Sequence, residues 1–340
     1  MKVAKVTSKK TVAIENMDKP QLKDNEVLVK VAMTGVCGSD LHLYEDTHAF
    51  RKPPAILGHE IAGDIVEVGP AVKKHKVGDR VTIEPHVGCG ECHFCKEDLV
   101  NICISKKVPG TPNWIGTFVE YFNAEESTLH KIGDDISYEM GVMIEPLAVA
   151  IHAMKRCTNK HKDAIVILGV GTIGLLTQVV AKHMGYKTII TTDPAPFNRE
   201  VSLKLGAKVS LDPLTEDVAK AVAELTNNNG ADATIICAGA DNILDQASEI
   251  TKKRGEICIV SMITNKIPFY CYSVVFKEQV ITGSMTYQTE DFVEATTMIN
   301  QGLDLSLLIT HKFDIDNTDQ GLKVLSEKKE NVGKVLITMG

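Results

Sequence analysis

The chain has 340 residues, more than one hydrophobic core usually organises, so its length predicts two domains. With 44% hydrophobic and 24% charged residues, its composition is that of an ordinary soluble globular protein. The formal net charge of −7 argues against binding to nucleic acid or to an anionic membrane surface, because both need a basic footprint.

The first residues, MKVAKVTSKK, lack the apolar centre of a signal peptide. No uncharged apolar run approaches the roughly 18–20 residues that span a bilayer. These features favour a cytoplasmic protein. In that compartment the nine cysteines, an odd number, favour metal binding or burial over a disulfide framework.

The first part of the chain, up to about residue 145, predicts short strands separated by turns. EVLVKVAMTG, IAGDIVEVG and DRVTIEPHVG are rich in Val and Ile and are bounded by Gly, Pro and Asp. This pattern is typical of a compact, mostly antiparallel barrel or sandwich.

The pattern changes at Met140, where EMGVMIEPLAVAIHAM predicts a long, largely buried helix. The apolar run AIVILG follows, and then TIGLLTQVVAKHMG with helical spacing. The strand–helix alternation continues through TIITTD, SLKLGA, ATIICAGA, ILDQASEITKKRG and EICIVSMI, and it predicts an α/β, doubly wound parallel sheet. After Gly283 we expect a helix, EDFVEATTMINQG, and a closing strand, VGKVLITMG, that rejoins the first domain.

A glycine-rich loop follows the apolar strand AIVIL and opens a helix, as a dinucleotide-binding motif requires. Gly169 permits the tight turn, Gly171 lets a pyrophosphate approach the backbone, and Gly174 lets the helix pack on the strand. Asp193 ends the next strand, 19 residues beyond Gly174, where an acidic residue accepts hydrogen bonds from the adenosine ribose. Its charge would repel a 2′-phosphate, so the sequence favours NAD over NADP.

Four cysteines are concentrated on one loop, GCGECHFCKEDLVNIC. Four thiolates so close together match a closed, tetrahedral structural zinc site. An iron–sulfur cluster is the alternative ion, and a zinc ribbon that reads nucleic acid is the alternative function. The acidic balance weighs against the ribbon. The residues are Cys89, Cys92, Cys95 and Cys103.

The single cysteines are interpreted as buried small hydrophobes: Cys157, Cys237, Cys258 and Cys271.

A second set of metal ligands is spread over GVCGSDLHLY, ILGHEIAG and MIEPLAV. A catalytic zinc has three protein ligands and an open position, and Cys37, His59 and Glu60 are suitable ligands. Glu145 is a carboxylate within an apolar helix, where an unpaired charge would be costly. Singly, these residues also fit a buried thiol, a capped histidine and surface glutamates.

Together these motifs resemble the zinc-containing medium-chain alcohol dehydrogenase family. The resemblance is carried by GVCGSDLH, GHEIAGDIVEVGPAV, KVGDRV, the four-cysteine loop, IEPLAVAIHA and GVGTIG, in the family's order. IEPLAVAIHA is most similar to the sorbitol (polyol), threonine and butanediol dehydrogenase branch, which has glutamate where ethanol-type enzymes have a second zinc-binding cysteine. The resemblance implies a GroES-like β-barrel catalytic domain over residues 1–147, a Rossmann NAD-binding domain over 148–287, and a segment 288–340 that returns to the first.

The resemblance also implies a mechanism. Cys37 and His59 would hold the catalytic zinc, with Glu60 and Glu145 binding it directly or through its water. As a Lewis acid, zinc would lower the pKa of the bound hydroxyl. Ser39 would then accept the proton and pass it through the cofactor ribose towards His42.

Hydride would move from the carbinol carbon to the nicotinamide. The remaining cofactor contacts implied by the resemblance are Ile173, Asn198, Arg199, Val260, Ser261, Met262, Met285, Thr286 and Tyr287.

The sequence therefore predicts a zinc-dependent oxidoreductase that transfers hydride between NAD and a secondary alcohol or polyol, giving the ketone. The alternatives are an L-threonine 3-dehydrogenase, a 2,3-butanediol dehydrogenase and, from another class, a non-catalytic NAD-binding zinc protein. Two zinc ions per chain are expected, one catalytic and one structural. The family suggests a homo-oligomer, a tetramer or dimer.

Overall fold

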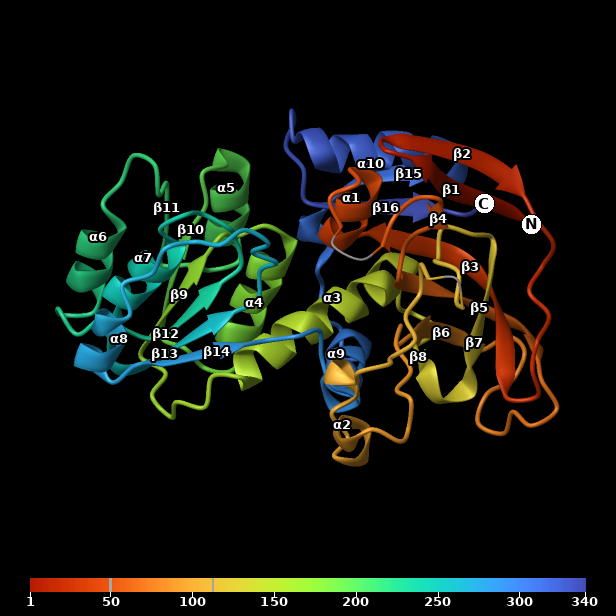
Figure 1. The fold of residues 1–340 in the computed structure, drawn as a ribbon, viewed down its shortest axis with the longest axis horizontal. Coiled ribbons are helices and arrows are strands. Elements are labelled where there is room, and N and C mark those ends of the chain that lie inside the picture. The colour runs from red at the N-terminus through yellow and green to blue at the C-terminus, as the bar shows by residue number, and fades with distance from the viewer. Residues whose placement is uncertain (49–50, 112) are drawn as a thin grey trace. The chain divides into compact units, whose positions relative to one another are not determined.

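The structure is a computed structural model that describes residues 1–48, 51–111 and 113–340 (Figure 1). It divides into two compact units, one of residues 1–145 with 288–340 and the other of residues 146–287. The division falls within helix α3 (Tyr138–Lys155). None of the helices in the described ranges is long and apolar enough to cross a membrane.

The first unit is built mainly of β-strands. A three-stranded sheet has the order β2-β1-β4, and a larger sheet has the order β15-β16-β3-β5-β6-β8, with β7 paired to β3. The strands are β1 (Lys2–Ser8), β2 (Thr11–Asn16), β3 (Glu26–Val36), β4 (Ala55–Ile56), β5 (Glu60–Val68), β6 (Arg80–Ile83), β7 (Tyr121–Glu125), β8 (Leu129–Lys131), β15 (Ile309–Asp314) and β16 (Lys334–Thr338). The helices are α1 (Gly38–Tyr44), α2 (His93–Lys96), α9 (Thr289–Asn300) and α10 (Thr318–Glu327), with 3-10 turns at Val100–Ile102, Glu126–Thr128, Ser306–Leu308 and Ile315–Asn317.

Strand β3 is the centre of this unit because it pairs with β5, β7 and β16. Its alternate residues Val27, Val29 and Val31 are completely buried in the core. The pairing of β16 with β3 is antiparallel and sets Val335 opposite Val36. The last strand of the chain thus lies against the segment that leads into Cys37.

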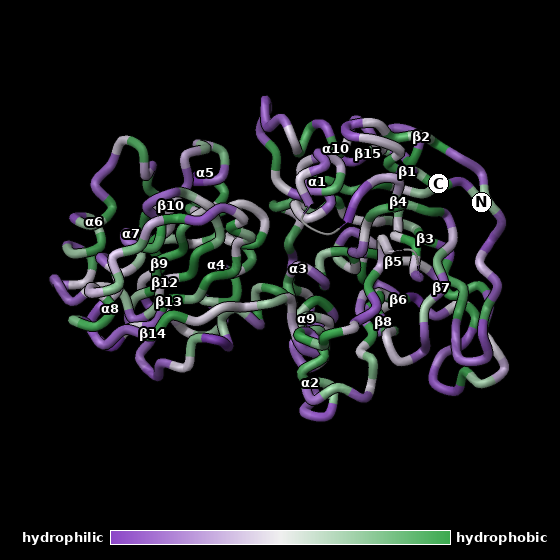
Figure 2. The backbone as a smooth tube through the Cα atoms, in the orientation of Figure 1, coloured by the Kyte–Doolittle hydropathy of each residue, from purple (hydrophilic) through white to green (hydrophobic). Residues whose placement is uncertain are grey.

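The second unit is a six-stranded parallel sheet in the order β11-β10-β9-β12-β13-β14. If the strands of this sheet are numbered along the chain with β9 as the first, their spatial order is 3-2-1-4-5-6, the order of a Rossmann fold. Figure 2 shows its central strands in the hydrophobic colour. The strands are β9 (Ala164–Leu168), β10 (Thr188–Thr192), β11 (Val209–Leu211), β12 (Ala231–Ile236), β13 (Thr251–Ile259) and β14 (Val280–Gly283). The helices are α4 (Thr172–His183), α5 (Pro196–Lys204), α6 (Val218–Leu225), α7 (Ile243–Ile250) and α8 (Tyr272–Lys277).

The register aligns the carboxyl ends of these strands. Thr192, Leu168, Ile236, Ile259 and Gly283 form one continuous row across five strands. The loops that follow them leave from a single edge of the sheet, where open α/β sheets bind their ligands.

Candidate active site

Two short segments bring Cys37 and His59 together. Cys37 is the N-cap of α1, and His59 immediately precedes β5. The carboxylate of Asp40 connects the segments, because it accepts the Cys37 N–H at 3.0 Å and the Gly58 N–H at 3.2 Å. One ligand atom from each of Cys37, His59 and Glu60 lies within 4.8 Å of the other two. These three residues form a metal-sized group of donors.

Glu60 is 1% exposed and forms an ion pair with Lys334 of β16, which is 3% exposed. The Lys334 ammonium also donates to the Val36 carbonyl at 3.2 Å. Gly35 makes room for the pair, since a Cβ at this position would collide with the Glu60 carboxylate and the end of the Lys334 side chain.

Negative charge dominates this group of donors. Burial lowers the pKa of His59, but the nearby charges of Cys37, Asp40 and Glu145 outweigh burial and raise that pKa well above its usual value. Burial also lowers the pKa of Lys334, and Glu60, Cys37 and Glu145 raise it overall. A site that stabilises positive charge so strongly, with thiol, imidazole and carboxylate donors, fits a divalent zinc ion.

Glu145 is 5% exposed and lies in α3 next to Pro146, a proline inside the helix. Its charge acts on His59 and Lys334, yet it does not belong to the group whose ligand atoms lie within 4.8 Å of one another. Ser39 and His42 both lie in α1, three positions apart and therefore on one helix face. His42 Nδ1 is 3.2 Å from the Thr47 hydroxyl.

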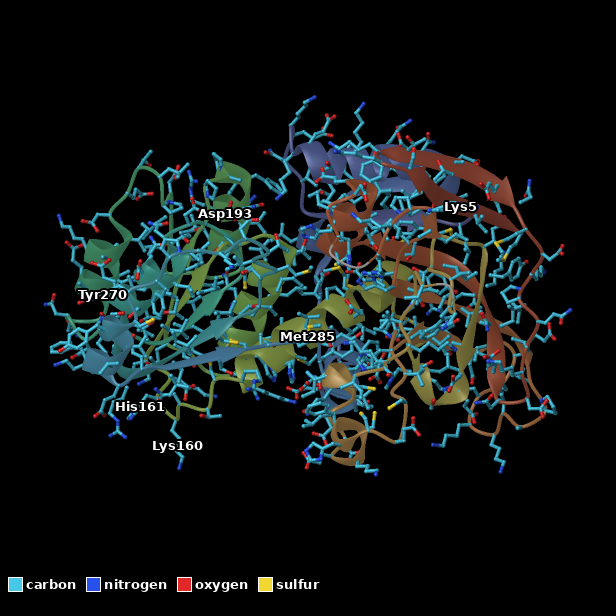
Figure 3. All side chains as sticks on the ribbon, in the orientation of Figure 1. Lys5, Lys160, His161, Asp193, Tyr270 and Met285 are labelled. Atoms are coloured by element: carbon cyan, nitrogen blue, oxygen red, sulfur yellow. The ribbon has the colours of Figure 1, made fainter. Side chains whose placement is uncertain are left out.

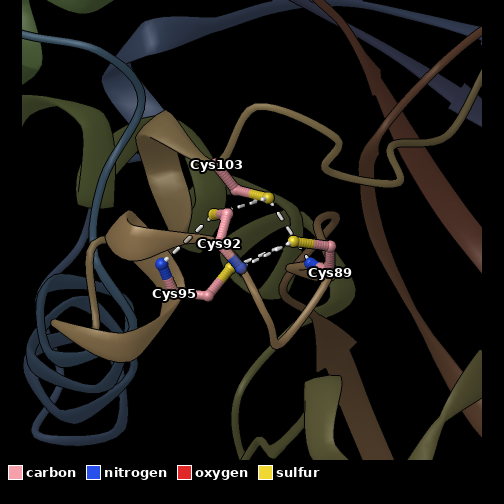
Figure 4. Close-up of side chains that lie close together, drawn as sticks. All are labelled: Cys89, Cys92, Cys95 and Cys103. Carbon is pink, nitrogen blue, oxygen red and sulfur yellow. Dashed lines mark hydrogen bonds between the residues drawn. The ribbon is translucent and has the colours of Figure 1, made fainter.

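The four-cysteine loop converges on one point (Figure 4). One sulfur from each of the four residues lies within 4.8 Å of the others. The Cys89–Cys95 sulfurs are 3.9 Å apart, and the Cys92–Cys103 sulfurs are 3.8 Å apart. A tetrahedral ion with Zn–S bonds of about 2.3 Å holds its sulfurs about 3.8 Å apart. The spacing fits a single zinc ion, whereas a multi-iron cluster would separate its thiolates further.

Backbone N–H groups orient these sulfurs. Cys103 Sγ accepts the Cys89 and Ser105 N–H groups, Cys89 Sγ accepts the Cys92 N–H, and Cys92 Sγ accepts the Cys95 N–H, all at 3.4 Å. The bond from the Cys95 N–H lowers the pKa of the Cys92 thiol to about 6. The pKa of Cys103 is also lowered. A backbone hydrogen bond lowers the pKa of Cys95, but burial and the Cys103 thiol outweigh it and raise that pKa to about 12. Cys92 and Cys103 are therefore the sulfurs that favour the thiolate form a metal ion binds.

The glycine loop has the three features that the motif requires. Gly169 has a φ of +90°, which suits the turn after β9. A Cβ at Gly171 would meet no protein atom within 4 Å, so the backbone there faces open space. A Cβ at Gly174 would collide with the Gly169 carbonyl, which shows how closely α4 packs on the loop.

Asp193 follows β10 and is 7% exposed (Figure 3). Its carboxylate accepts the Val170 N–H at 2.9 Å and the Ala195 N–H at 2.9 Å, so it joins the glycine loop to the start of α5. Arg199 donates to the Asp193 carbonyl at 2.7 Å and lies 3.3 Å from the Asp212 carboxylate. These bonds hold the guanidinium beside the acidic residue rather than in solvent.

The other expected cofactor contacts are distributed over the same sheet edge. Ile173 and Asn198 lie in α4 and α5. Residues 260–262 follow β13, and residues 285–287 follow β14. Met262 and Met285 are 57% and 54% exposed, whereas Tyr287 is 1% exposed. The Ser261 hydroxyl donates to the Ala238 carbonyl at 2.9 Å.

One sequence expectation is wrong. Cys271 is exposed, not buried, because it precedes the six-residue helix α8, none of whose residues is buried. Cys237 and Cys157 are partly exposed, and Cys258 is buried as expected. All nine cysteines are free.

Sequence reasoning missed two residues that organise the site, Asp40 and Lys334. Each left a signal. Asp40 follows Cys37 by three positions, as the acidic residue of a capping box does. Lys334 opens the strand KVLIT just before the apolar run Val335–Ile337, and lysine is almost never fully buried unless it is paired.

Comparisons with known proteins agree with this geometry. Residues 23–134 match the family described as "Alcohol dehydrogenase GroES-like domain", and residues 172–301 match "Zinc-binding dehydrogenase". The chain is 33% identical to a sorbitol dehydrogenase of Bacillus subtilis (strain 168), over 99% of this chain and 97% of the relative. It is 35% identical to a D-arabitol-phosphate dehydrogenase of Enterococcus avium, over 94% and 92%. It is 32% identical to an L-threonine 3-dehydrogenase of Pyrococcus horikoshii, over 95% and 94%.

Solved structures show the same likeness. A 2R,3R-butanediol dehydrogenase of Bacillus subtilis superposes with a TM-score of 0.91 at 30% identity, over 100% of this chain and 99% of the other. A protein of Sinorhizobium meliloti 1021, described as a zinc-binding dehydrogenase and bound to NADP, has a TM-score of 0.92 at 28% identity, over 99% of each chain.

The chain belongs to the zinc-containing medium-chain alcohol dehydrogenase family, in its polyol branch. It is an oxidoreductase that acts on the CH–OH group of its substrate, with a Rossmann unit and a GroES-like unit.

Proposed function

We propose that the protein uses NAD to oxidise a polyol or another secondary alcohol to its ketone. The observation that carries this proposal is the group of Cys37, His59 and Glu60, whose ligand atoms lie within 4.8 Å of one another beside a buried Lys334. Cys37 and His59 would hold zinc, with Glu60 and Glu145 as the carboxylates around it. Bound there, zinc would supply the Lewis acidity that lowers the pKa of the substrate hydroxyl.

The chain's own residues would then handle the proton. The Ser39 hydroxyl accepts it from the substrate, and His42, on the same face of α1, takes it towards solvent. The Thr47 hydroxyl fixes the orientation of the His42 ring through its contact with Nδ1. By accepting the Cys37 and Gly58 N–H groups, Asp40 fixes the two segments relative to each other. The Cys37 thiol and the His59 imidazole therefore keep their positions through the reaction.

For the cofactor, the glycine loop and the start of α4 would bind the pyrophosphate, since α4 offers N–H groups without a side-chain cap. The Asp193 carboxylate would accept hydrogen bonds from the adenosine ribose and repel a 2′-phosphate. Bound there, NAD would supply the acceptor for the hydride. Comparable kcat/KM with NADP would contradict this choice of cofactor.

A screen of NAD reduction against sorbitol, other polyols, 2,3-butanediol and threonine tests the substrate class. We expect turnover with polyols, and turnover with threonine alone would assign the chain to the alternative activity. Metal analysis should give two zinc ions per chain. Cys37→Ala should lose one ion and turnover while NAD still binds, as measured by fluorescence titration. Retained turnover would refute the zinc role of Cys37.

The same proposal includes a cytoplasmic location and a homo-oligomer, dimer or tetramer. The nine free cysteines, four of them arranged for a metal ion, are in keeping with a reducing compartment. Light scattering of the purified protein measures the oligomeric state directly.

A further inference from the structure

Cys157 and Cys258 lie 101 positions apart in the sequence and meet in the unit of residues 146–287. Cys157 follows the C-terminal end of α3, and Cys258 lies within β13. The two thiols are close enough for each to shift the pKa of the other. Neither residue belongs to the metal groups or to the glycine loop, so the activity described above leaves this thiol pair unused.

Hydrogen bonds before and after Cys157 fix its segment over β13 and β14. Before it, Arg156 donates to the Gly283 carbonyl at 3.1 Å and to the Thr282 hydroxyl at 2.9 Å. Thr282 is the β14 residue paired in register with Cys258. The pairing places the Arg156 contact directly beside Cys258.

After Cys157, the chain is held by Glu256. The Thr158 hydroxyl donates to this carboxylate at 2.9 Å and the Asn159 N–H donates to it at 3.0 Å. Glu256 and Cys258 are two residues apart in β13, so their side chains project from the same face of the sheet. The contacts on both sides of Cys157 therefore hold this residue beside Cys258.

The two sulfurs differ in access and in charge. Cys258 is 0% exposed, whereas Cys157 is partly exposed and can be reached from solvent. The neighbouring Cys157 lowers the pKa of the Cys258 thiol, and the neighbouring Cys258, with burial, raises the pKa of the Cys157 thiol. Cys258 is therefore the sulfur with the greater thiolate character, and Cys157 is the sulfur with the greater access.

We propose that Cys157 and Cys258 form an oxidation site, in which hydrogen peroxide converts the two thiols into an intrachain disulfide that added thiol reverses. A sulfur of the pair attacks the peroxide and becomes a sulfenic acid, Cys–SOH, with the second peroxide oxygen leaving as water after protonation. The partner sulfur then displaces the sulfenic oxygen, which leaves as a second water. Two thiols and one peroxide give one disulfide and two waters.

The remaining single cysteines have different surroundings and serve as comparisons. Cys271 is exposed, and its thiol contacts the Phe269 carbonyl at 3.8 Å. Cys237 Sγ lies 3.9 Å from the Thr177 hydroxyl. Peroxide can take the exposed Cys271 along the sequence of sulfur acids, whereas Cys157 and Cys258 each have the other thiol nearby to stop the reaction at a disulfide.

The test uses the zinc-loaded protein, treated with a graded excess of hydrogen peroxide, alkylated without reduction, digested and analysed by mass spectrometry. We expect a peptide joined through Cys157 and Cys258, two mass units lighter than the sum of its parts, that disappears after dithiothreitol. Cys271→Ser should give the same linked peptide. Cys157→Ser should abolish it and leave Cys258 reduced, because the buried thiol then has neither partner nor access.

The proposal is wrong if Cys157 and Cys258 are both recovered alkylated at peroxide concentrations that oxidise Cys271. It is equally wrong if Cys157 proceeds to sulfinic acid while Cys258 remains reduced, or if Cys258 is found linked to Cys237 instead.

Discussion

Lys334 is a buried cation whose partner, Glu60, is also buried, and each compensates the charge of the other. Removing one member of such a pair leaves an uncompensated charge, which costs about 3–5 kcal/mol of folding free energy. Lys334→Met should therefore destabilise the metal-free protein by that amount in urea unfolding. Zinc bound beside Glu60 would supply the missing positive charge, so the loss should be smaller in the zinc-loaded protein.

Lys312→Met is the matched control. Lys312 lies on the neighbouring strand β15 and pairs with Glu139 at 2.7 Å, but it is half exposed. Exposed ion pairs contribute at most about 1 kcal/mol. If both lysine variants lose the same stability, or if zinc makes no difference to Lys334→Met, the role assigned to Lys334 is wrong.

Alanine substitutions at two glycines near Cys37, Gly35 and Gly38, distinguish a specific effect on the position of Glu60 from a general effect of mutation. At Gly35 an added Cβ collides with Glu60 and Lys334, whereas at Gly38 it meets no protein atom within 4 Å. Gly35→Ala should displace the Glu60 carboxylate and lower the affinity for the proposed catalytic zinc ion, by tenfold or more in chelator competition. Gly38→Ala should retain both ions. Equal metal retention would show that Glu60 does not need its present position.

At the scale of elements, the four-cysteine loop has little regular structure to hold it. Helix α2 has four residues, and none of them is buried. Without an ion, the loop depends on weak N–H···S bonds and on the turn at Val100–Ile102. Metal-binding energy is folding energy for a loop of this kind.

Cys95→Ser should accordingly lose one zinc ion and lower the melting temperature by several degrees, as measured by calorimetry with metal analysis of the same sample. The exposed Cys271→Ser is the control for loss of a thiol and should melt like the unmodified protein. An unchanged melting curve for Cys95→Ser would mean that the ion contributes nothing to stability.

The sequence predicts elements well where the signal is local. The run AIVIL, bounded by Gly169, is strand β9 as expected. The stretch ILDQASEITKKRG, by contrast, is divided, since α7 ends at Ile250 and β13 begins at Thr251. Thr251 is β-branched and bonds back to the Ala247 carbonyl at 2.6 Å, which ends the helix, and its strand pairing with Ala231 is a tertiary contact.

The residues of the candidate active site also fall into those that the sequence predicts and those that only tertiary contacts reveal. Ligand type and the resemblance of their motifs singled out Cys37, His59, Glu60 and Glu145, and the structure brings one ligand atom from each of the first three within 4.8 Å of the others. The counter-ion could not be found by spacing, because Lys334 reaches Glu60 from a strand 274 positions away. Only the pairing of β16 with β3 creates that contact. The Cys157–Cys258 pair could not be found from spacing either, because the two residues are 101 positions apart and only the folded chain brings them together.

At the scale of the whole molecule, the chain leaves the first unit after Glu145 and returns to it at Gln288. Glu84 binds the start of this returning segment, because the Thr289 hydroxyl donates a hydrogen bond to the Glu84 carboxylate at 2.9 Å. His86 Nε2 lies 3.0 Å from the same carboxylate, and His130 Nε2 lies 3.4 Å from it. A buried carboxylate thus joins β6, β8 and the start of α9.

The acid stability of the protein should depend on this carboxylate. Burial alone would raise the pKa of Glu84, but the bonds from His130, His86 and Thr289 outweigh it and hold the pKa at about 2. A folded-state pKa below the unfolded value of 4.5 stabilises the protein above pH 4.5, by about 3 kcal/mol here, and that contribution is lost as the pH falls towards 2. Glu84→Gln should be less stable at pH 7, and its deficit should shrink between pH 4.5 and 3 in urea unfolding. The exposed Glu67→Gln should track the unmodified protein throughout; a Glu84→Gln deficit that stays constant with pH would show that Glu84 acts through packing and not through its charge.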